Sequence, residues 1–307
     1  MDRPRFRVAD VVRRHGAAFV AAHGARLTHE QKKALLDIES CRTAVLGGHV
    51  EVYACGHEVI AYNSCRNRCC PRCLGHKARE WVEKKERDLL PVPYFHIVFT
   101  LPHQLAAVPV IARVALYEAL FRASAATLRE VARRRLGGEI GFLSVLHTWG
   151  QTLTHHPHIH CVVAGGALEP GRKKWAPSRA RFFLPVRVLS KVFKGKMLDE
   201  LRRRELPGLT PLALEQILAE AARTGWVVYA KPPFGGPAQV LRYLARYTHK
   251  IAISDHRVVS VDDAEVAFTY KDYRADGATK TMRLAADEWL RRFVTHVPPR
   301  GFVRLRS

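Results

Sequence analysis

The 307-residue sequence lacks any apolar run of the roughly 18 residues that a membrane-spanning helix needs. Its first residues, MDRPRFRVADVVRRHG, mix charges into the apolar positions, which is not the pattern of a secretory signal. Internal repeats are absent as well. We therefore expect a cytoplasmic protein without a membrane partner, and in that compartment cysteines are more often metal ligands than disulfides.

Acidic residues are also scarce. Only 28 Asp and Glu stand against 50 Lys and Arg, which gives a net charge of +22 and an isoelectric point near 10.2. Folding does not need this excess, but a phosphate polyanion attracts it, because each neutralised phosphate releases condensed counterions. Hydrophobic residues make up 48% of the chain, enough for a packed core. The composition favours a folded nucleic-acid-binding protein over a ribosomal-type or membrane-surface protein.

Hydrophobic periodicity predicts an α+β fold with mainly antiparallel pairing. The clearest strand is 94–101, because four apolar residues alternate with His96, Val98 and Thr100. Thr28 followed by Gln31 predicts a helix start. Residues 170–210 are basic and weakly patterned, and we expect them to be solvated surface. The other expected helices lie in 5–38, 77–90, 103–136, 212–224, 237–248 and 286–297, and the other strands at 49–53, 58–62, 142–149, 158–164 and 226–230, with a hairpin from 251–253 and 257–261.

Five of the seven cysteines lie between Cys55 and Cys73. The segment from Cys70 to Cys73 reads C-P-R-C, a turn that presents two thiolates to one Zn²⁺. A second pair should lie elsewhere, and Cys55 is the first candidate for it. Cys65 and Cys41 compete for the fourth place, with outside candidates at His49, His57 and Cys69. Because all of these ligands are protein groups, we predict a closed, structural zinc site.

A histidine-rich run, HHPHIH, occupies residues 155–160. His158 and His160 are two apart in a strand-like segment, so both imidazoles lie on one face. Two such side chains can chelate one divalent ion, which in phosphate chemistry polarises the scissile phosphate as a Lewis acid. The pattern predicts a site for Mg²⁺ or Mn²⁺, and imidazole ligands favour Mn²⁺.

Two tyrosines lie four residues apart in a helical segment. This spacing places Tyr243 and Tyr247 on the same face, one turn apart. Tyrosine can attack phosphorus and form a phosphotyrosine, which divides one displacement into two. Aromatic pairs at this spacing usually belong to a core, so the catalytic interpretation depends on the histidine pair. The residues around the tyrosines suit a DNA phosphate, namely Arg242, Arg246, His249 and Lys250.

Several of these segments together resemble the HUH-superfamily transposases of the ninety-one family of bacterial insertion sequences. The likeness rests first on HTWG at 147–150, HPHIH at 156–160 and YLARYTHKIAI at 243–253. It extends over nearly the whole chain through CRT at 41–43, YNSCRNR at 62–68, PVPYFHIVFTLP at 91–102, FLPVR at 183–187, WVVYAKP at 226–232 and KDYR at 271–274.

The resemblance implies two domains: N-terminal helices with a zinc-ribbon-like module over residues 1–90, then an HUH nuclease domain with a central antiparallel sheet flanked by helices over 91–307. It implies rolling-circle transposition in the bacterial cytoplasm at the nucleoid. There, a tyrosine cleaves single-stranded DNA at the element ends, keeps the 5′ end as a phosphotyrosine and frees a 3′-OH. No particular oligomeric state is predicted.

The resemblance also assigns the site residues. His158 and His160 hold the catalytic Mg²⁺ or Mn²⁺, and Tyr243 and Tyr247 are the nucleophiles. Candidates for a third metal ligand are His156, His249 and Gln151. The cysteine pattern, rather than the resemblance, assigns structural Zn²⁺ to Cys55, Cys65, Cys70 and Cys73, with Cys41 as the alternative. DNA contacts are expected from Arg66, Arg68, Arg242, Arg246 and Lys250.

This chain departs from the family pattern in three places. Relatives carry CxxC where it has VYAC at 52–55, and a histidine where it has Cys69. We therefore expect a zinc site that recruits Cys41 or Cys69, or a weakened one. Relatives also run further past 302–307, so we expect a shortened copy whose catalytic motifs are intact.

Three other functions compete with transposition. One is a plasmid or phage replication initiator with the same chemistry. Another is a nuclease that uses metal-activated water without a covalent step, and the third is a non-catalytic zinc-containing DNA-binding protein. The zinc module and the HTWG and YLARYTHK segments favour transposition.

Overall fold

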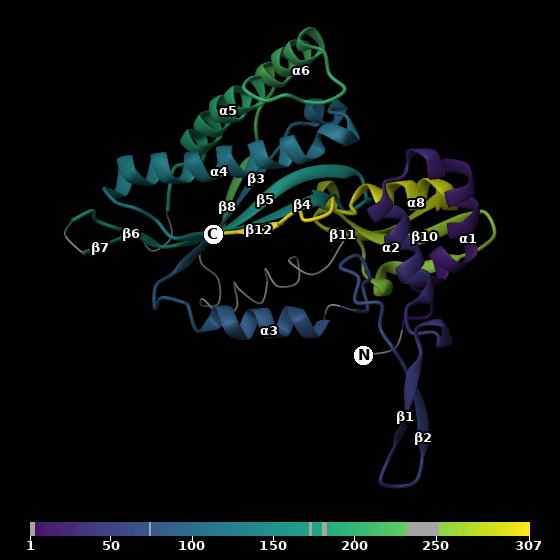
Figure 1. Cartoon of the computed structure of the whole chain (residues 1–307). Coiled ribbons are helices and arrows are strands. Elements are labelled where there is room, and N and C mark those ends of the chain that lie inside the picture. The colour runs from purple at the N-terminus through teal and green to yellow at the C-terminus, as the bar shows by residue number, and fades with distance from the viewer. Residues whose placement is uncertain (1–3, 74, 172–173, 180–182, 232–251) are drawn as a thin grey trace. The chain divides into compact units, whose positions relative to one another are not determined.

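The structure is a computed structural model, and it describes residues 4–73, 75–171, 174–179, 183–231 and 252–307. The chain forms two compact units. The first unit comprises residues 1–80, 149–155 and 249–300, and the second comprises 81–148, 156–248 and 301–307. Each is described by itself below, with the elements labelled as in Figure 1.

The second unit is built on a five-stranded sheet with the strand order β12-β4-β5-β3-β8. Its antiparallel pairing confirms the predicted central sheet. Two further strands, β6 and β7, pair beside it. The strands are β3 (Tyr94–Thr100), β4 (Phe142–Trp149), β5 (His155–Ala164), β6 (Gly166–Leu168), β7 (Trp175–Pro177), β8 (Val228–Lys231) and β12 (Leu305–Arg306).

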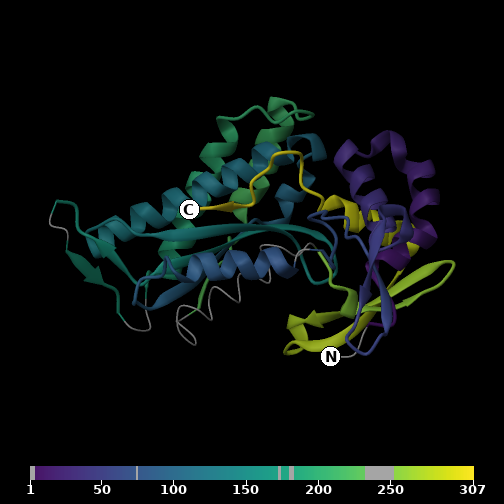
Figure 2. The same ribbon diagram turned by 60° about the horizontal axis from the view of Figure 1, so that its bottom comes forward.

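Helices cover one face of this sheet. Figure 1 and Figure 2 show α4 (Arg113–Leu136) and α5 (Val186–Arg202) on the same side of it, beside α6 (Pro211–Arg223). α4 ends at Gly137, whose φ of +74° is the left-handed conformation that glycine adopts without a Cβ clash. Apolar residues that alternate along β3 and β5 pack on these helices: Phe95, Ile97 and Phe99 with Ile159, Cys161 and Val163. The period-two pattern thus positions the histidines of β3 and β5 on the opposite face.

α5 corrects the expectation that residues 170–210 are solvated surface. Its apolar residues recur every four positions and are buried in the main core: Leu189, Phe193, Met197 and Leu201. The basic residues between them occupy the other faces of the helix, which hid the pattern in the sequence.

The first unit combines N-terminal and C-terminal elements. α1 (Val8–His23), α2 (His29–Ser40) and α8 (Ala286–Thr295) share a core that includes Phe19, Ile38 and Trp289. A three-stranded antiparallel sheet has the order β11-β10-β9. Its strands are β9 (Val258–Val261), β10 (Glu265–Asp272) and β11 (Ala278–Ala285). The predicted hairpin of 251–253 with 257–261 is wrong, because β9 pairs instead with β10.

The remaining elements belong to both units. Thr28 caps α2 as predicted, since its side chain accepts a hydrogen bond from the amide of Gln31. The strands expected at 49–53 and 58–62 form the hairpin of β1 (Gly48–Val52) and β2 (Glu58–Tyr62). α3 spans Gly75–Glu86, and the short 3₁₀ helices are η1 (Gly24–Arg26), η2 (Ala44–Leu46), η3 (His103–Ala107), η4 (Val110–Ala112), η5 (Asp255–Arg257) and η6 (Tyr273–Ala275).

The loop between β4 and β5 belongs to the first unit. Leu153 at its centre is buried, and the backbone carbonyl oxygens around it accept hydrogen bonds from Arg257, Arg292 and His296. The sequence did not indicate that residues 252–300 pack with the N-terminal helices. The domain boundary between residues 90 and 91 stays a prediction. Among the helices described, none combines the length and apolar character that crossing a membrane requires.

Candidate metal centres

Four cysteines of the first unit gather their sulfur atoms in one place. They are Cys41, Cys65, Cys70 and Cys73, and the four Sγ atoms all lie within 4.8 Å of one another. The Sγ of Cys41 is 3.3 Å from that of Cys73 and 3.6 Å from that of Cys70, and the Sγ atoms of Cys65 and Cys73 are 3.5 Å apart. Tetrahedral Zn²⁺ with bonds of about 2.3 Å separates its sulfurs by roughly 3.8 Å. The cluster therefore fits a four-thiolate zinc site.

The backbone around the cluster is shaped for this arrangement. Arg42 and Arg66 each follow a cluster cysteine directly, and both have positive φ values of 55° and 52°. The left-handed conformation costs a non-glycine residue roughly 1–2 kcal/mol, so the surrounding structure must impose it. Asn67 anchors the second turn by donating from its side chain to Asp37 of α2 at 2.7 Å. These turns hold the thiols together on the end of α2.

Cys55 does not join the cluster. It is exposed in the turn between β1 and β2, where the amide of Tyr53 donates to the carbonyl of His57. Five residue pairs separate this turn from the base of the hairpin, a rise of roughly 16 Å at about 3.3 Å per residue. Cys41, which follows the last turn of α2, takes the fourth place instead. Cys69 is buried beside the group without belonging to it.

Hydrogen bonding among the four thiols spreads their pKa values apart. The contact with Cys65 is the main cause that lowers the pKa of Cys41 to about 6, whereas the contact with Cys41 raises the pKa of Cys70. The sulfurs thus compete for negative charge. A divalent cation would relieve this competition, because it stabilises all four as thiolates.

The second candidate centre lies on the sheet face opposite α4 and α5. His147 of β4 and His158 and His160 of β5 bring ligand nitrogens within 4.8 Å of one another. The ring centroid of His147 is 4.2 Å from that of His160 and 5.3 Å from that of His158. His158 and His160 share a face as their spacing predicts, and the neighbouring strand supplies a third imidazole.

Hydrogen bonds orient two of these rings. The Nδ1 of His158 donates to the carbonyl oxygen of His156 at 2.7 Å, which leaves Nε2 for an ion. The Nδ1 of His160 lies 2.7 Å from Nε2 of His96 on β3, and the two rings stack with an angle of 4° between their planes. When Nδ1 of His160 carries the ring proton, it donates to His96, and Nε2 becomes the metal-binding nitrogen.

Burial keeps this cluster uncharged. It lowers the pKa of His158 to about 4 and that of His96 to about 4. Burial also lowers the pKa of His147 and of His160 well below the ordinary value. The rings are therefore neutral at pH 7, the form in which imidazole binds a metal.

The remaining predicted residues are placed as follows. The side chain of Gln151 accepts from the amide of Lys271 at 3.3 Å, and His156 contributes its carbonyl rather than its ring, so neither is in the histidine group. Arg66 and Arg68 are exposed beside the cysteine cluster. The other predicted site residues lie outside the described residues: Tyr243, Tyr247, Arg242, Arg246, His249 and Lys250.

Sequence reasoning missed His147 and His96. His147 opens the HTWG run and lies near the end of a predicted strand, just before the short loop that leads to the strand of His158. His96 lies on the same face as Val98, which pairs with His160. Neither histidine can be assigned to the site from the sequence until the order of the strands is known.

Comparison with known proteins matches both parts of the chain. A family described as "Putative transposase" matches residues 141–307, and one described as "Transposase zinc-binding domain" matches residues 11–101. The chain is 48% identical to "Putative transposase y4qJ" of Sinorhizobium fredii, over 97% of this chain and 78% of that protein. It is 32% identical to "Transposase for insertion sequence element IS801" of Pseudomonas savastanoi pv. phaseolicola, over 87% and 67%. No solved structure matches it.

Proposed function

The chain belongs to the IS91-type transposases, enzymes that cleave DNA, and from this premise we propose that it nicks and rejoins single-stranded DNA at element ends by rolling-circle transposition. The phenolic oxygen of Tyr243 or Tyr247 attacks the scissile phosphorus. The bond to the 3′ oxygen breaks, the 5′ phosphate stays on the tyrosine, and the 3′-OH leaves with its proton. The second tyrosine allows a second attack before the first product is released.

The histidine group carries this proposal. His147, His158 and His160 offer three neutral nitrogens, a donor set that suits Mn²⁺ or Mg²⁺ and leaves the charge of the ion available to a phosphate. Such an ion, when bound, polarises the scissile phosphate as a Lewis acid. The carbonyl of His156 fixes the tautomer of His158, and the ring of His96 holds the orientation of His160, so these two imidazoles need little reorganisation.

The test of the proposal is a covalent adduct. The full chain is incubated with Mn²⁺ and labelled single-stranded oligonucleotides from the element's own ends, then denatured and resolved. Transposition chemistry predicts labelled protein together with a free 3′-OH fragment. Cleavage without labelled protein would indicate metal-activated water, and tight binding without cleavage would indicate a non-catalytic DNA-binding protein.

His96 is expected to act as a positioning residue for His160. Replacing His96 with phenylalanine fills the same space but removes the hydrogen bond to Nδ1, and such second partners change metal affinity by about 10–100-fold. We expect Mn²⁺ affinity, measured by calorimetry, to fall by that factor, and His96→Gln to recover part of it. Unchanged affinity in His96→Phe would show that the contact is structural only.

We also propose that Cys41, Cys65, Cys70 and Cys73 hold one structural Zn²⁺. The family match over residues 11–101 and the tetrahedral fit of the four sulfurs support it. Every ligand is a protein side chain, which is typical of closed sites that stabilise folding rather than catalyse. In this chain the ion would tie the turns at 42 and 66 to the end of α2.

Cys41→Ser is expected to reduce zinc from about one ion per chain to well below half, and to lower the melting temperature. Cys55→Ser is the matched control, because Cys55 is exposed and outside the cluster. Elemental analysis after gel filtration measures both variants. If Cys55→Ser lost zinc while Cys41→Ser kept it, the ligand set would have to be redrawn.

A further inference from the structure

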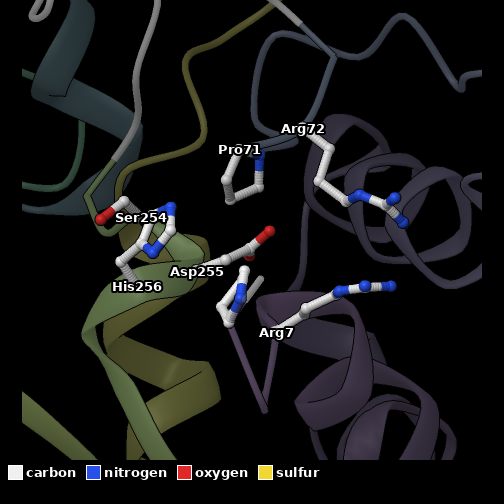
Figure 3. Close-up of a pocket in the computed structure, with 7 residues that line it drawn as sticks. Arg7, Pro71, Arg72, Ser254, Asp255 and His256 are labelled. Atoms are coloured by element: carbon white, nitrogen blue, oxygen red, sulfur yellow. The ribbon is translucent and has the colours of Figure 1, made fainter. Parts of the chain in front are cut away.

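A cavity of about 460 Å³ lies in the first unit beside the cysteine cluster (Figure 3). Three segments that are distant in the sequence line it: the residues before α1, the turn between Cys70 and Cys73, and the start of η5. The lining residues are Pro4, Arg7, Pro71, Arg72, Ser254, Asp255 and His256. Neither the histidine group nor the zinc proposal uses this cavity.

Two arginines dominate its charge. Figure 3 shows Arg7 and Arg72 extending in the same direction from opposite walls. In the described part of the chain, neither guanidinium group forms an ion pair or a hydrogen bond, and the same is true of nearby Arg42. Other arginines of this unit are neutralised, as Arg14 is by Asp263 and Arg292 by Glu288. All five N–H donors of each cavity arginine are therefore unused by the protein.

The positive charges are close enough to repel one another. Arg7 and Arg72 line the same cavity, and neither is paired with a carboxylate there. Arginine still stays protonated at neutral pH, so this repulsion persists in the folded protein. A bound anion would relieve it.

The one carboxylate in the cavity has another task. The Oδ1 of Asp255 accepts a hydrogen bond from the amide of Val8 at 3.0 Å and so caps the first turn of α1 from a distant part of the chain. Asp255 is buried and forms no ion pair with Arg7 or Arg72. Two arginines thus line the cavity with a single carboxylate that the backbone already engages, and the lining is positive overall.

We propose that this cavity binds one phosphodiester group of the DNA strand, with Arg7 and Arg72 donating to its two non-bridging oxygens. The planar fork of arginine matches the spacing of phosphate oxygens. The inference rests on the proposed function only in taking DNA as the ligand, and it concerns binding rather than cleavage.

The location of Arg72 gives the cysteine cluster a second role. Arg72 lies between two of the cluster cysteines, so the turn that presents the thiols also places Arg72 on the wall of the cavity. An ordered zinc site would then hold a phosphate contact in place. Loss of zinc in Cys41→Ser should weaken DNA binding as well as stability.

The test compares two double variants. The cavity variant combines Arg7→Ala and Arg72→Ala, and the control variant combines Arg14→Ala and Arg291→Ala, which removes two charges that are already paired. Affinity for a single-stranded oligonucleotide is measured without Mn²⁺ or Mg²⁺ over a range of salt. We expect affinity to fall about tenfold or more in the cavity variant alone. The slope of log K against log salt should drop by about 0.7 for the lost phosphate.

Oligonucleotides with one neutral methylphosphonate identify the contacted phosphate. We expect one position to weaken binding to the wild-type chain and to have no effect on the cavity variant. Inorganic phosphate at millimolar concentration is added as a competitor of the oligonucleotide. We expect it to displace little of the DNA, whereas strong displacement would indicate a site for a free anion rather than for a strand. The melting temperature and the zinc content of each variant verify its folding. A milder double variant, Arg7→Lys combined with Arg72→Lys, keeps the charge.

Equal salt slopes in the cavity and control variants, or an unchanged methylphosphonate pattern, would overturn the proposal. The result is separable from the cleavage mechanism. The binding assay contains no Mn²⁺ or Mg²⁺, so its outcome does not depend on whether the chain cleaves DNA. An inactive wild-type chain that nevertheless shows the predicted interference pattern would refute the cleavage proposal and leave the phosphate site standing.

Discussion

Replacing His147 with alanine is expected to slow DNA cleavage by about a thousandfold while leaving most of the DNA affinity intact. His147 is buried, and its ligand nitrogen lies within 4.8 Å of those of His158 and His160. Losing one of three ligands weakens an ion that contributes several kcal/mol to the transition state, and each 1.4 kcal/mol is a factor of ten in rate. Affinity depends mainly on the basic charge of the chain. Single-turnover cleavage with Mn²⁺ and a binding assay measure the two separately.

His156→Ala is the matched control for this prediction. Its ring lies 5.4 Å from that of His158 between centroids, but the hydrogen bond that orients His158 is accepted by the backbone carbonyl of His156, which survives the substitution. We expect nearly wild-type cleavage. The double variant His158→Ala with His160→Ala should abolish cleavage, and adding His147→Ala should cause little further loss because the three ligands act as one unit. Cleavage at the wild-type rate in His147→Ala would remove this residue from the metal site.

The contrast between His158 and His147 shows which parts of a site the sequence can reveal. His158 and His160 are two apart on one strand, and period two alone places them on one face. His147 joins them from the neighbouring strand, eleven residues before His158. Its position depends on strand order and on the length of the loop that joins β4 to β5, and no local pattern contains this information.

The cysteine cluster also combines ligands that the sequence predicts with one that it does not. The C-P-R-C turn predicts Cys70 and Cys73 because its spacing is local. The preference for Cys55 over Cys41 rested on proximity in sequence. The β1–β2 hairpin pairs over five residues and places Cys55 at its exposed end. Cys41 directly follows the last residue of α2 and lies beside the C-P-R-C turn. Residues of remote segments therefore decide the ligand set.

In the fold as well, local patterns were predicted and long-range packing was not. Strands with clear alternation, such as β3, and helices with a recognisable cap, such as α2, were predicted well. α5 was not, since its apolar residues are embedded in a basic segment. The packing of residues 252–300 on α1 and α2 was also missed, because it requires contacts across more than 200 residues, such as that of Val8 with Asp255.

The second large effect is expected from the tyrosine pair. Tyr243→Phe combined with Tyr247→Phe removes only the two attacking oxygens. We expect this variant to bind DNA and to keep its metals, but to form no covalent adduct. Each phenylalanine preserves the volume of the ring, so folding should survive unless a buried hydrogen bond is lost. Denaturing gels with end-labelled oligonucleotides measure the adduct, and melting curves check the fold.

The single variants separate the two attacks. Starting and finishing a strand transfer takes two displacements, and each of them consumes one phenolic oxygen. We therefore expect at least one single variant to cleave the donor strand but fail to complete transfer, so that labelled adduct accumulates instead of rejoined DNA. If Tyr243 attacks first, Tyr247→Phe is that variant. Mass spectrometry of the trapped adduct identifies the modified residue, and a phosphopeptide that contains neither Tyr243 nor Tyr247 would defeat the mechanism.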